Sequence, residues 1–459
     1  MTERPRIPRS EGEMMASSGK ALLLESVRKY HHEVSADQPF EPGATPLLPA
    51  GAVLDEEDRA GLVEAALDLR ITAGVRTRKF ESAFARLFKL RKAHLTNSGS
   101  SANLLALTAL TSPRLEERRL RPGDEVITVA AGFPTTVNPI VQNGLVPVFV
   151  DIDLATYNTT AERVAAAIGP KTRAIMIAHA LGNPFEVAEI AELAEEHGLF
   201  LVEDNCDAVG STYHGRLTGT FGDLATVSFY PAHHMAMGEG GCVLTGNLAL
   251  ARIVESLRDW GRDCWCEPAE DNKCLKRFDH QMGTLPHGYD HKYIFSHVGY
   301  NLKPTDLQAA LGLTQLPKLD AFCAARRRNW RALRDALDGT PGLLLPEPTA
   351  GSDPSWFGFA ITVRPDAGFT RGQLTAHLEA RRIGTRRLFA GNLTRHPAYQ
   401  DVRYRTVGPL TNSDIVTEHT FWIGVHPNLT PEMTAYMAQC VREFAAGASG
   451  ASGGTRKAA

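Results

Sequence analysis

Short apolar runs alternate with helix-like segments between residue 93 and residue 245. The runs have the length and the β-branched content of buried strands, and the segments between them, such as 101–110 and 187–198, have the spacing of amphipathic helices. Strand–helix–strand alternation is typical of a mostly parallel sheet covered by helices. The pattern therefore predicts an α/β fold with strands at 94–97, 125–130, 146–153, 174–180, 200–205, 224–230 and 241–246.

The rest of the chain divides around this segment. Residues 1–45 are polar apart from a helical stretch at 19–34, which predicts a tail and an arm that packs on the body. Asp55 is the predicted N-cap of a helix with apolar residues at 62, 66, 67 and 69. We expect a large domain over 46–325, a smaller C-terminal α/β domain over 326–445 beginning with a helix at 327–339, and a flexible tail over 446–459.

Composition narrows the classes of function. The 459 residues are 43% hydrophobic and 22% charged, with a formal net charge of −3, so no basic excess indicates a nucleic acid partner. The chain has no apolar run of about 18 residues and no apolar core in its first twenty, so we expect a cytoplasmic protein without a membrane span. In that compartment the seven cysteines favour metal ligands or redox groups over disulfides.

Residues 95–110 predict a strand, a turn of small residues and a helix. The backbone amides of Gly99, Ser100 and Ser101 would lie at the start of that helix, where free N–H groups and the helix dipole favour an anion such as phosphate. An ordinary capped helix explains the same residues, because serine is a common N-cap.

Three further residues stand at or just past the predicted strand ends, where parallel sheets bind ligands. Asp204 could hold a pyridine nitrogen protonated, and Ser228 could reach a phosphate. Phe133 could stack on a flat cofactor. Each also has a structural explanation, as a turn cap or a core aromatic, so the assignment depends on finding them together.

In this order the motifs resemble the DegT/DnrJ/EryC1 family of sugar aminotransferases, which are fold-type I pyridoxal-phosphate enzymes. The resemblance includes ITAGVRTRKFE (71–81), NSGSSAN (97–103), EDNCDA (203–208), SFYPAHHMAMGEGG (228–241), GYNLKPTDLQAALG (299–312) and, more weakly, GVHPNLT (424–430). It implies a large cofactor-binding domain with a mostly parallel mixed sheet, and a homodimer or higher oligomer with active sites at the interface. It also implies that Asn301 of the neighbouring subunit contacts the cofactor phosphate.

The position that carries the family's lysine is occupied here by His233. A lysine would hold the cofactor covalently, whereas imidazole cannot, although it is a good general base near neutral pH. We therefore expect pyridoxamine 5′-phosphate (PMP) to bind without a covalent bond. His234 is one residue past the matched position and is the weaker candidate for the base. A chain that lost its lysine and only binds nucleotide sugar is the alternative.

The segment SFYPAHH (228–234) is similar to that of the nucleotide-sugar 3-dehydrases within this family. That resemblance implies removal of the C-3 hydroxyl from a nucleoside diphosphate 4-keto-6-deoxyhexose, with Tyr230 and Asp207 beside the base. Asp207 would orient the imidazole or meet the ring hydroxyl of the cofactor, and Tyr230 would assist proton movement. An aminotransferase side activity with the same cofactor remains open.

Four cysteines, Cys206, Cys264, Cys266 and Cys274, form the pattern C-x57-C-x-C-x7-C. Four thiolates can hold a 2Fe–2S cluster, and the spacing matches the cluster-containing type of 3-dehydrase. The resemblance places the cluster in a loop at 259–274 and implies an electron-donating partner, either a flavin and iron–sulfur reductase or a ferredoxin or flavodoxin with its reductase. Structural zinc is the alternative, although zinc sites usually show paired cysteines closer in sequence.

The basic segment 381–400 is placed over the active site by the resemblance. It offers four candidate contacts to the diphosphate or the sugar, Arg386, Arg387, Asn392 and Arg395. His287 and His297 are further candidates for the substrate pocket. The Ala- and Arg-rich composition favours a TDP-4-keto-2,6-dideoxy-D-glucose substrate, used for secondary metabolites, over a CDP sugar used for surface polysaccharide.

Overall fold

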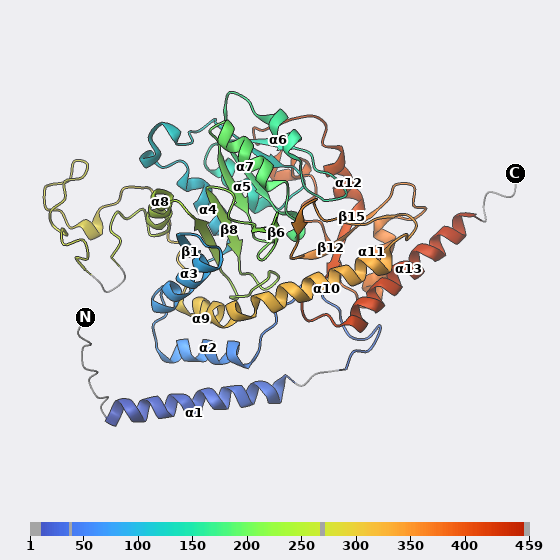
Figure 1. Ribbon diagram of the computed structural model, residues 1–459, viewed down its shortest axis with the longest axis horizontal. Coiled ribbons are helices and arrows are strands. Elements are labelled where there is room, and N and C mark those ends of the chain that lie inside the picture. Colours follow the sequence, from blue (N-terminus) through green and yellow to red (C-terminus); the bar gives the residue numbers. More distant parts are fainter. Residues whose placement is uncertain (1–10, 36–38, 267–270, 454–459) are drawn as a thin grey trace.

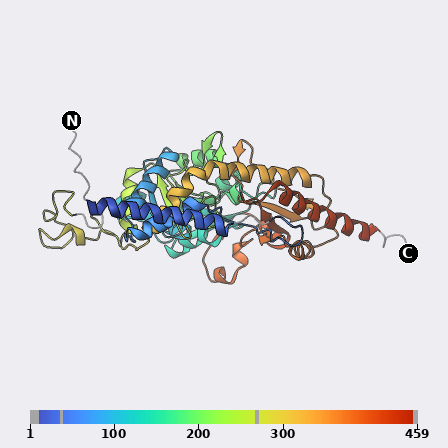
Figure 2. The same ribbon diagram turned by 90° about the horizontal axis from the view of Figure 1, so that it is seen from below.

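The structure is a computed structural model that describes residues 11–35, 39–266 and 271–453. The expected tail at residues 1–10, part of the predicted cluster loop at 267–270 and the last six residues of the chain lie outside the described residues. Two sheets organise the body, with helix α1 (Glu11–Val34) lying along one side and helix α13 (Pro431–Gly453) at one end, as Figure 1 and Figure 2 show.

The larger sheet has the strand order β1-β9-β8-β5-β4-β2-β3-β14, and only β9 runs antiparallel to its neighbours. All seven strands predicted from the sequence are present in it, each ending or beginning within a few residues of the expected position. Their bounds are β1 (Lys92–Thr96), β2 (Glu125–Val129), β3 (Val146–Val150), β4 (Thr172–Ala178), β5 (Phe200–Asp204), β8 (Leu224–Ser228), β9 (Gly241–Thr245) and the added edge strand β14 (Arg405–Thr406).

Helices cover both faces of this sheet because successive strand residues point to opposite faces. Val126 packs in a core with α4 (Gly99–Ala109), α5 (Pro134–Gln142) and α8 (Leu248–Arg258). The next residue, Ile127, packs in a second core with α6 (Ala161–Ala167) and α7 (Val187–Glu196). The nearly continuous apolar strands are thus explained by burial on two sides.

The second sheet is antiparallel, with the order β10-β12-β15-β13. It shares one core with α10, α11 and α13, which contains Leu333, Phe359, Leu374, Phe421 and Val441. The bounds are β10 (Leu343–Leu344), β12 (Gly358–Val363), β13 (Arg386–Arg387), β15 (Thr420–Gly424), α10 (Leu319–Leu337) and α11 (Arg371–Ala380), while α12 (Thr411–His419) packs beside β15. A small third sheet joins β6 (Thr212–Tyr213), β7 (Arg216–Leu217) and β11 (Ser352–Asp353).

Asp55 caps α2 (Glu56–Leu67) as predicted, and its side chain accepts hydrogen bonds from the amides of Glu57 and Asp58. The predicted apolar face of this helix was wrong, because its buried residues are Asp58, Ala60 and Ala65. Helix α2 packs between α1 and α9 (Asp306–Gln315), with α3 (Val75–Leu87) also against α9, and this leaves Leu67 exposed.

Three helix ends differ from the sequence predictions. Helix α1 begins at residue 11 instead of 19, and α10 begins at Leu319 instead of residue 327 and ends at Leu337. Helix α13 continues to Gly453, past residue 446, where the flexible tail was predicted to begin. Alanine favours the helix there, and Ala445 and Ala448 still pack on the core of the second sheet. Among the described residues, no helix is long and apolar enough to cross a membrane.

The end of β5 is fixed by Glu203, a fully buried carboxylate. It accepts backbone hydrogen bonds from Gly219 at 2.6 Å and from Phe221 and Gly222 at 2.7 Å each, and His179 Nε2 lies 3.3 Å away. The Glu203 carboxylate thus accepts the backbone N–H groups of the turn at 219–222, which have no partner strand. These bonds also fix the position of the next residue, Asp204.

We predict that Glu203→Gln lowers the free energy of unfolding by about 2–3 kcal/mol, because an amide places one donor group against backbone N–H groups. Denaturant unfolding followed by circular dichroism measures the change. Glu192→Gln, on the exposed face of α7, is the matched control. Equal stability of the two variants would contradict the role assigned to Glu203.

Candidate active site

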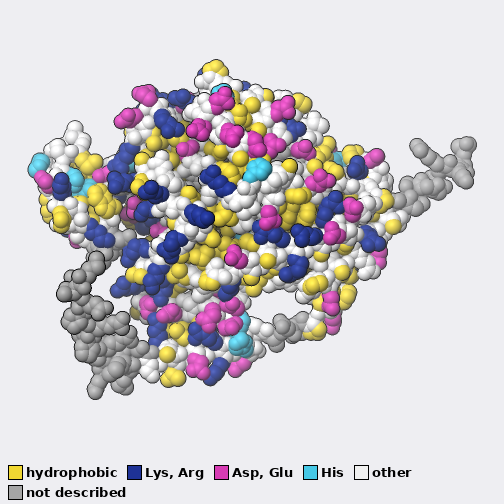
Figure 3. All heavy atoms as spheres, in the orientation of Figure 1, with side chains coloured by type: hydrophobic (Ala, Val, Ile, Leu, Met, Phe, Trp, Pro, Cys, Tyr) yellow, Lys and Arg dark blue, Asp and Glu magenta, His cyan; other side chains and the backbone are white. Residues whose placement is uncertain are grey.

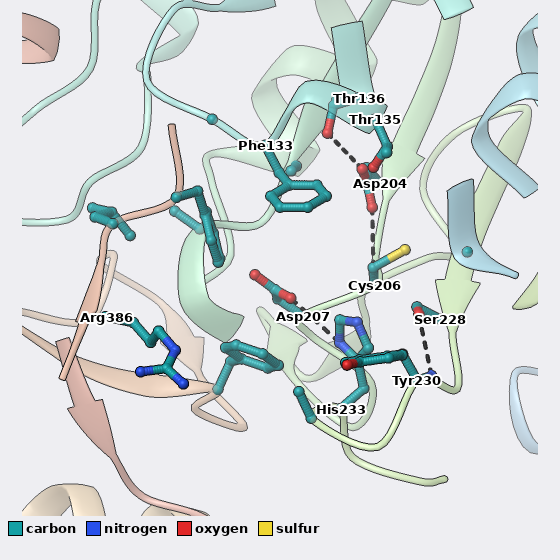
Figure 4. A pocket seen from close by; sticks show the side chains of 18 of the residues that line it. Phe133, Thr135, Thr136, Asp204, Cys206, Asp207, Ser228, Tyr230, His233 and Arg386 are labelled. Carbon is teal, nitrogen blue, oxygen red and sulfur yellow. Dashed lines mark hydrogen bonds and ion pairs between the residues drawn. The ribbon is translucent and has the colours of Figure 1, made fainter. Parts of the chain in front are cut away.

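A cavity of about 950 Å³ opens where β2, β4, β5 and β8 of the large sheet end, and the second sheet closes it from the other side. Strand ends and the helix termini that follow them supply most of its lining, while Phe357, Trp422 and the segment 386–389 come from the second sheet. Figure 4 shows the side chains that face this space. The position agrees with the rule that open parallel sheets bind ligands beyond the carboxyl ends of their strands.

One end of the cavity is formed by the start of α4. Ser98 caps the helix and accepts a hydrogen bond from the amide of Ser101, while Gly99 and Ser100 line the cavity. A Cβ on Gly99 would lie 2.5 Å from the Cβ of Ser228, so glycine is required for the helix to approach the end of β8 this closely. The free amides and the hydroxyl groups gathered here suit an anion.

Asp204 forms the buried polar wall of the cavity. Its Oδ2 accepts hydrogen bonds from Asn103 Nδ2 at 2.8 Å and Thr136 Oγ1 at 2.6 Å, and its Oδ1 accepts one from the amide of Cys206 at 3.2 Å. The ring of Phe133 lies on the same side of the cavity as Asp204, is 49% exposed and lies edge-on to Phe389. A planar ligand ring bound here would have the carboxylate of Asp204 at its edge and the ring of Phe133 against one face.

His233 reaches the cavity from the turn after β8. Its Nδ1 lies 3.4 Å from Oδ1 of Asp207, and the ring of Tyr230 stands beside it in Figure 4. Burial, together with the positive charge of Arg326, lowers the pKa of His233 to about 3. Burial and the negative charge of Asp204 raise the pKa of Asp207. The imidazole is therefore neutral near pH 7.

Arg326 on α10 is a functional neighbour that the sequence analysis missed. Its guanidinium is 1% exposed and donates to the carbonyls of Ala232 and His233 on one side and of Trp356 and Phe357 on the other. The sequence offers no signal for this, because Arg326 lies in an Arg-rich helical stretch, about 93 residues from His233.

Most of the candidate residues meet in the cavity. Its lining includes Gly99, Ser100, Phe133, Asp204, Cys206, Asp207, Ser228, Tyr230, His233, Arg386 and Arg387. It also includes Thr135, Thr136, Asn158 and Glu239, which sequence reasoning did not select. The two threonines follow Phe133 and Pro134 in the motif AAGFPTT, so polar residues at the start of the next helix were the available signal.

Other candidates lie outside the cavity lining. Ser101 is used in the cap of α4, and Asn392 caps a short turn and donates to Asp414. Arg395 pairs with Asp414 and Glu418. His234 hydrogen-bonds through Nε2 with the carbonyl oxygen of Ser355, which agrees with its weaker candidacy as a base. Asn301, His287 and His297 lie between α8 and α9 and do not line the cavity of their own chain.

The four cysteines are divided between two places. Cys206 lines the cavity, whereas Cys264, Cys266 and Cys274 gather in the segment 259–305 between α8 and α9, here called the cysteine loop. Cys264 Sγ accepts a hydrogen bond from the amide of Cys266, and Cys274 Sγ lies 3.9 Å from His291 Nδ1. No described residue of the loop lines the cavity. The expected four-thiol site is therefore not formed within one chain, and the residues of a single chain do not fit a four-cysteine cluster.

The fold and the cavity define an aminotransferase-like pyridoxal-phosphate enzyme of fold-type I. A model of the DegT/DnrJ/EryC1/StrS aminotransferase family matches residues 53–442, and the chain belongs to this family.

Two curated relatives cover nearly the whole chain. It is 68% identical to a dTDP-4-dehydro-2,6-dideoxy-D-glucose 3-dehydratase of Saccharopolyspora spinosa, over 95% of this chain and 94% of the relative. It is 52% identical to the lipopolysaccharide biosynthesis protein RfbH of Salmonella typhimurium, over 94% of this chain and 99% of the relative. Among solved structures, a GDP-4-keto-6-deoxy-D-mannose-3-dehydratase of E. coli with bound hydrated PLP superimposes with a TM-score of 0.78 at 28% identity, covering 86% of this chain and 99% of that one.

We predict that Phe133→Leu weakens the binding of PMP about fivefold, because a stacked aromatic contributes about 1 kcal/mol beyond its buried area. Equilibrium dialysis of PMP against the purified variant measures the change. Phe40→Leu is the control, since that ring packs on the core of the second sheet and does not line the cavity. An unchanged affinity in Phe133→Leu would show that the ring does not stack on the cofactor.

Proposed function

We propose that this chain removes the C-3 hydroxyl of a nucleoside diphosphate 4-keto-6-deoxyhexose with PMP bound in the cavity. The observation that carries the proposal is that His233, at the position of the family's lysine, lines the same cavity as five of the predicted cofactor contacts, Gly99, Ser100, Phe133, Asp204 and Ser228. The relatives named as 3-dehydratases support the same reaction.

When bound, PMP supplies an amine that condenses with the ketone of the sugar and a ring that accepts electrons. The residues of the chain fit this group. The start of α4 with Ser100, together with Ser228, would hold the phosphate. Asp204, fixed by Asn103 and Thr136, would keep the pyridine nitrogen protonated, and Phe133 would cover one face of the ring.

His233 would take a proton from the cofactor carbon next to the ring, because its imidazole is neutral and already desolvated. Asp207 lies on the Nδ1 side of the imidazole, where it would orient the ring. Tyr230 stands on the same side of the cavity and would assist proton movement to the leaving hydroxyl group.

Arg386 and Arg387 would bind the diphosphate, because they are exposed at the wall that the second sheet contributes. Asn392 and Arg395 contact Asp414, so in this proposal they support the neighbouring segment. Asn301 would reach the phosphate of a neighbouring subunit. For the sugar we propose dTDP-4-keto-2,6-dideoxy-D-glucose, which is supported by the 68% identity to a dehydratase named for that substrate.

A complete deoxygenation needs two electrons, and the cavity residues include no redox group other than the thiol of Cys206. We therefore retain a 2Fe–2S cluster held by the four cysteines, and a flavin and iron–sulfur reductase, or a ferredoxin or flavodoxin system, as part of the proposal. The cytoplasm would keep these thiols reduced.

The decisive experiment is incubation of the PMP-loaded protein with dTDP-4-keto-2,6-dideoxy-D-glucose in ¹⁸O-labelled water without an electron donor. Reversible loss of the C-3 hydroxyl would place ¹⁸O at C-3, which mass spectrometry and NMR detect.

We predict that His233→Asn lowers the exchange rate by about 10²–10⁴-fold, the usual contribution of a general base. A 4-amino sugar formed with glutamate, without label at C-3, would show an aminotransferase instead.

We predict that Arg386→Gln raises KM for the nucleotide sugar about fivefold with little change in kcat, since an exposed arginine contributes about 1 kcal/mol to binding a phosphate. Steady-state kinetics of sugar consumption separate the two parameters. Arg395→Gln is the matched control and should leave KM unchanged, because Arg395 pairs with Asp414 and Glu418 outside the cavity. A larger rise in KM for Arg395→Gln than for Arg386→Gln would show that the diphosphate binds near Arg395 instead.

A further inference from the structure

Two aromatic side chains connect the base to the arginines along one wall of the active-site cavity. Phe357 and Trp422 both line the cavity, and each is only 5% exposed. The ring centroid of Phe357 lies 5.1 Å from that of His233 and 5.4 Å from that of Trp422. The indole N–H of Trp422 donates to the carbonyl oxygen of Arg387 at 2.9 Å. Phe357 and Trp422, here called the aromatic wall, therefore fill the space between His233 and the segment that carries the arginines.

The backbone that carries Phe357 is held from two sides. Its amide donates to the carbonyl oxygen of Leu181 at 2.8 Å, and its carbonyl oxygen accepts a hydrogen bond from Arg326 at 3.3 Å. A Cβ on Gly182 would lie 2.3 Å from the carbonyl oxygen of Ser355, so glycine is required for the two segments to approach this closely. The position of the Phe357 ring is therefore built into the fold.

The aromatic wall has no free hydrogen-bonding group. Phe357 has none, and the only polar group of the Trp422 side chain is used by the carbonyl oxygen of Arg387. Apolar side chains also reach the outer surface, but Figure 3 shows them there among charged and other polar groups. A hydroxyl group placed against the aromatic wall would lose water and gain no hydrogen bond from these two side chains.

The proposed reaction fixes which part of the sugar meets the aromatic wall. C-4 joins the amine of the cofactor, the hydroxyl on C-3 lies at His233, and the diphosphate on C-1 lies at Arg386 and Arg387. C-2 stands between C-3 and C-1 in the sugar ring, just as the aromatic wall stands between His233 and Arg387. C-2 would therefore lie against Phe357, the member of the wall that contacts the imidazole.

We propose that Phe357, supported by Trp422, selects nucleotide sugars that carry no hydroxyl group at C-2. The inference rests on the proposed function and adds the residue that determines one feature of its substrate. An apolar wall leaves an added hydroxyl group without a partner, and this discriminates against the hydroxylated sugar by about 10–100-fold.

Two substrates that differ only at C-2 test this selection. The PMP-loaded protein receives equal amounts of dTDP-4-keto-2,6-dideoxy-D-glucose and dTDP-4-keto-6-deoxy-D-glucose in ¹⁸O-labelled water without an electron donor. ¹³C NMR measures the label that enters C-3 of each sugar, and the ratio of the two initial rates gives the ratio of kcat/KM. We expect the 2-deoxy sugar to exchange about 10–100-fold faster in the unsubstituted protein.

Substitutions of Phe357 separate selection from packing. Phe357→His adds hydrogen-bonding nitrogens to the wall and should reduce the ratio about tenfold, whereas Phe357→Leu keeps the wall apolar and should keep the ratio. Both variants change the contact with His233, so both should slow the exchange of the two sugars alike. Phe389→His is the matched control and should not change the ratio, because that ring lines the cavity beside Phe133 and 6.3 Å from Phe357.

The comparison of the two sugars on the unsubstituted protein needs no variant, so the proposal can fail even where a substitution prevents folding. Equal exchange of both sugars would overturn the selection and leave the dehydration standing. A ratio reduced in Phe389→His and unchanged in Phe357→His would overturn the role of Phe357. Absence of label at C-3 of both sugars would refute the proposed function, and the selection with it.

Discussion

The buried guanidinium of Arg326 is the interaction on which the active site depends. It binds four carbonyl oxygens, two from the turn that carries His233 and two from the segment leading into β12. Burial of a cation without such partners would be strongly unfavourable, and burial lowers the pKa of Arg326 to about 10, so it remains charged at neutral pH. Its charge also opposes a second positive charge on His233. Arg326 therefore positions the imidazole, and its charge adds to burial in keeping the imidazole neutral.

Strand β5 of the large sheet also positions residues of the active site. Glu203 and Asp204 follow one another in a strand and so point to opposite faces. Glu203 holds the turn at 219–222, and Asp204 is held by Asn103 of α4 and Thr136 of α5. Both carboxylates are buried, and each is surrounded by donors, as buried charges require. The two carboxylates of the cavity wall are therefore held by the chain's own donors.

The sequence predicted the parts of the site that have a local signal. Strand ends followed by Asp204, Ser228 and Phe133 were found because parallel sheets place ligands there, and the family motif marked His233. Arg326 and Asn103 were missed because their partners lie about 93 and 101 residues away. Ser101 was predicted from its place at the start of a helix and Asn392 from its place in the segment 381–400, and the structure uses both in caps. Long-range partners of this kind leave no periodic pattern in a sequence.

The residues proposed for proton transfer and the thiols proposed for electron transfer are positioned in different ways. The residues for proton transfer, His233, Asp207 and Tyr230, all come from segments that follow β5 and β8, so a single chain assembles them. The thiols do not share such a framework, because three of them lie on a loop whose base is anchored away from the cavity. The residues proposed for acid–base chemistry are thus assembled within one chain, whereas the four thiols are not.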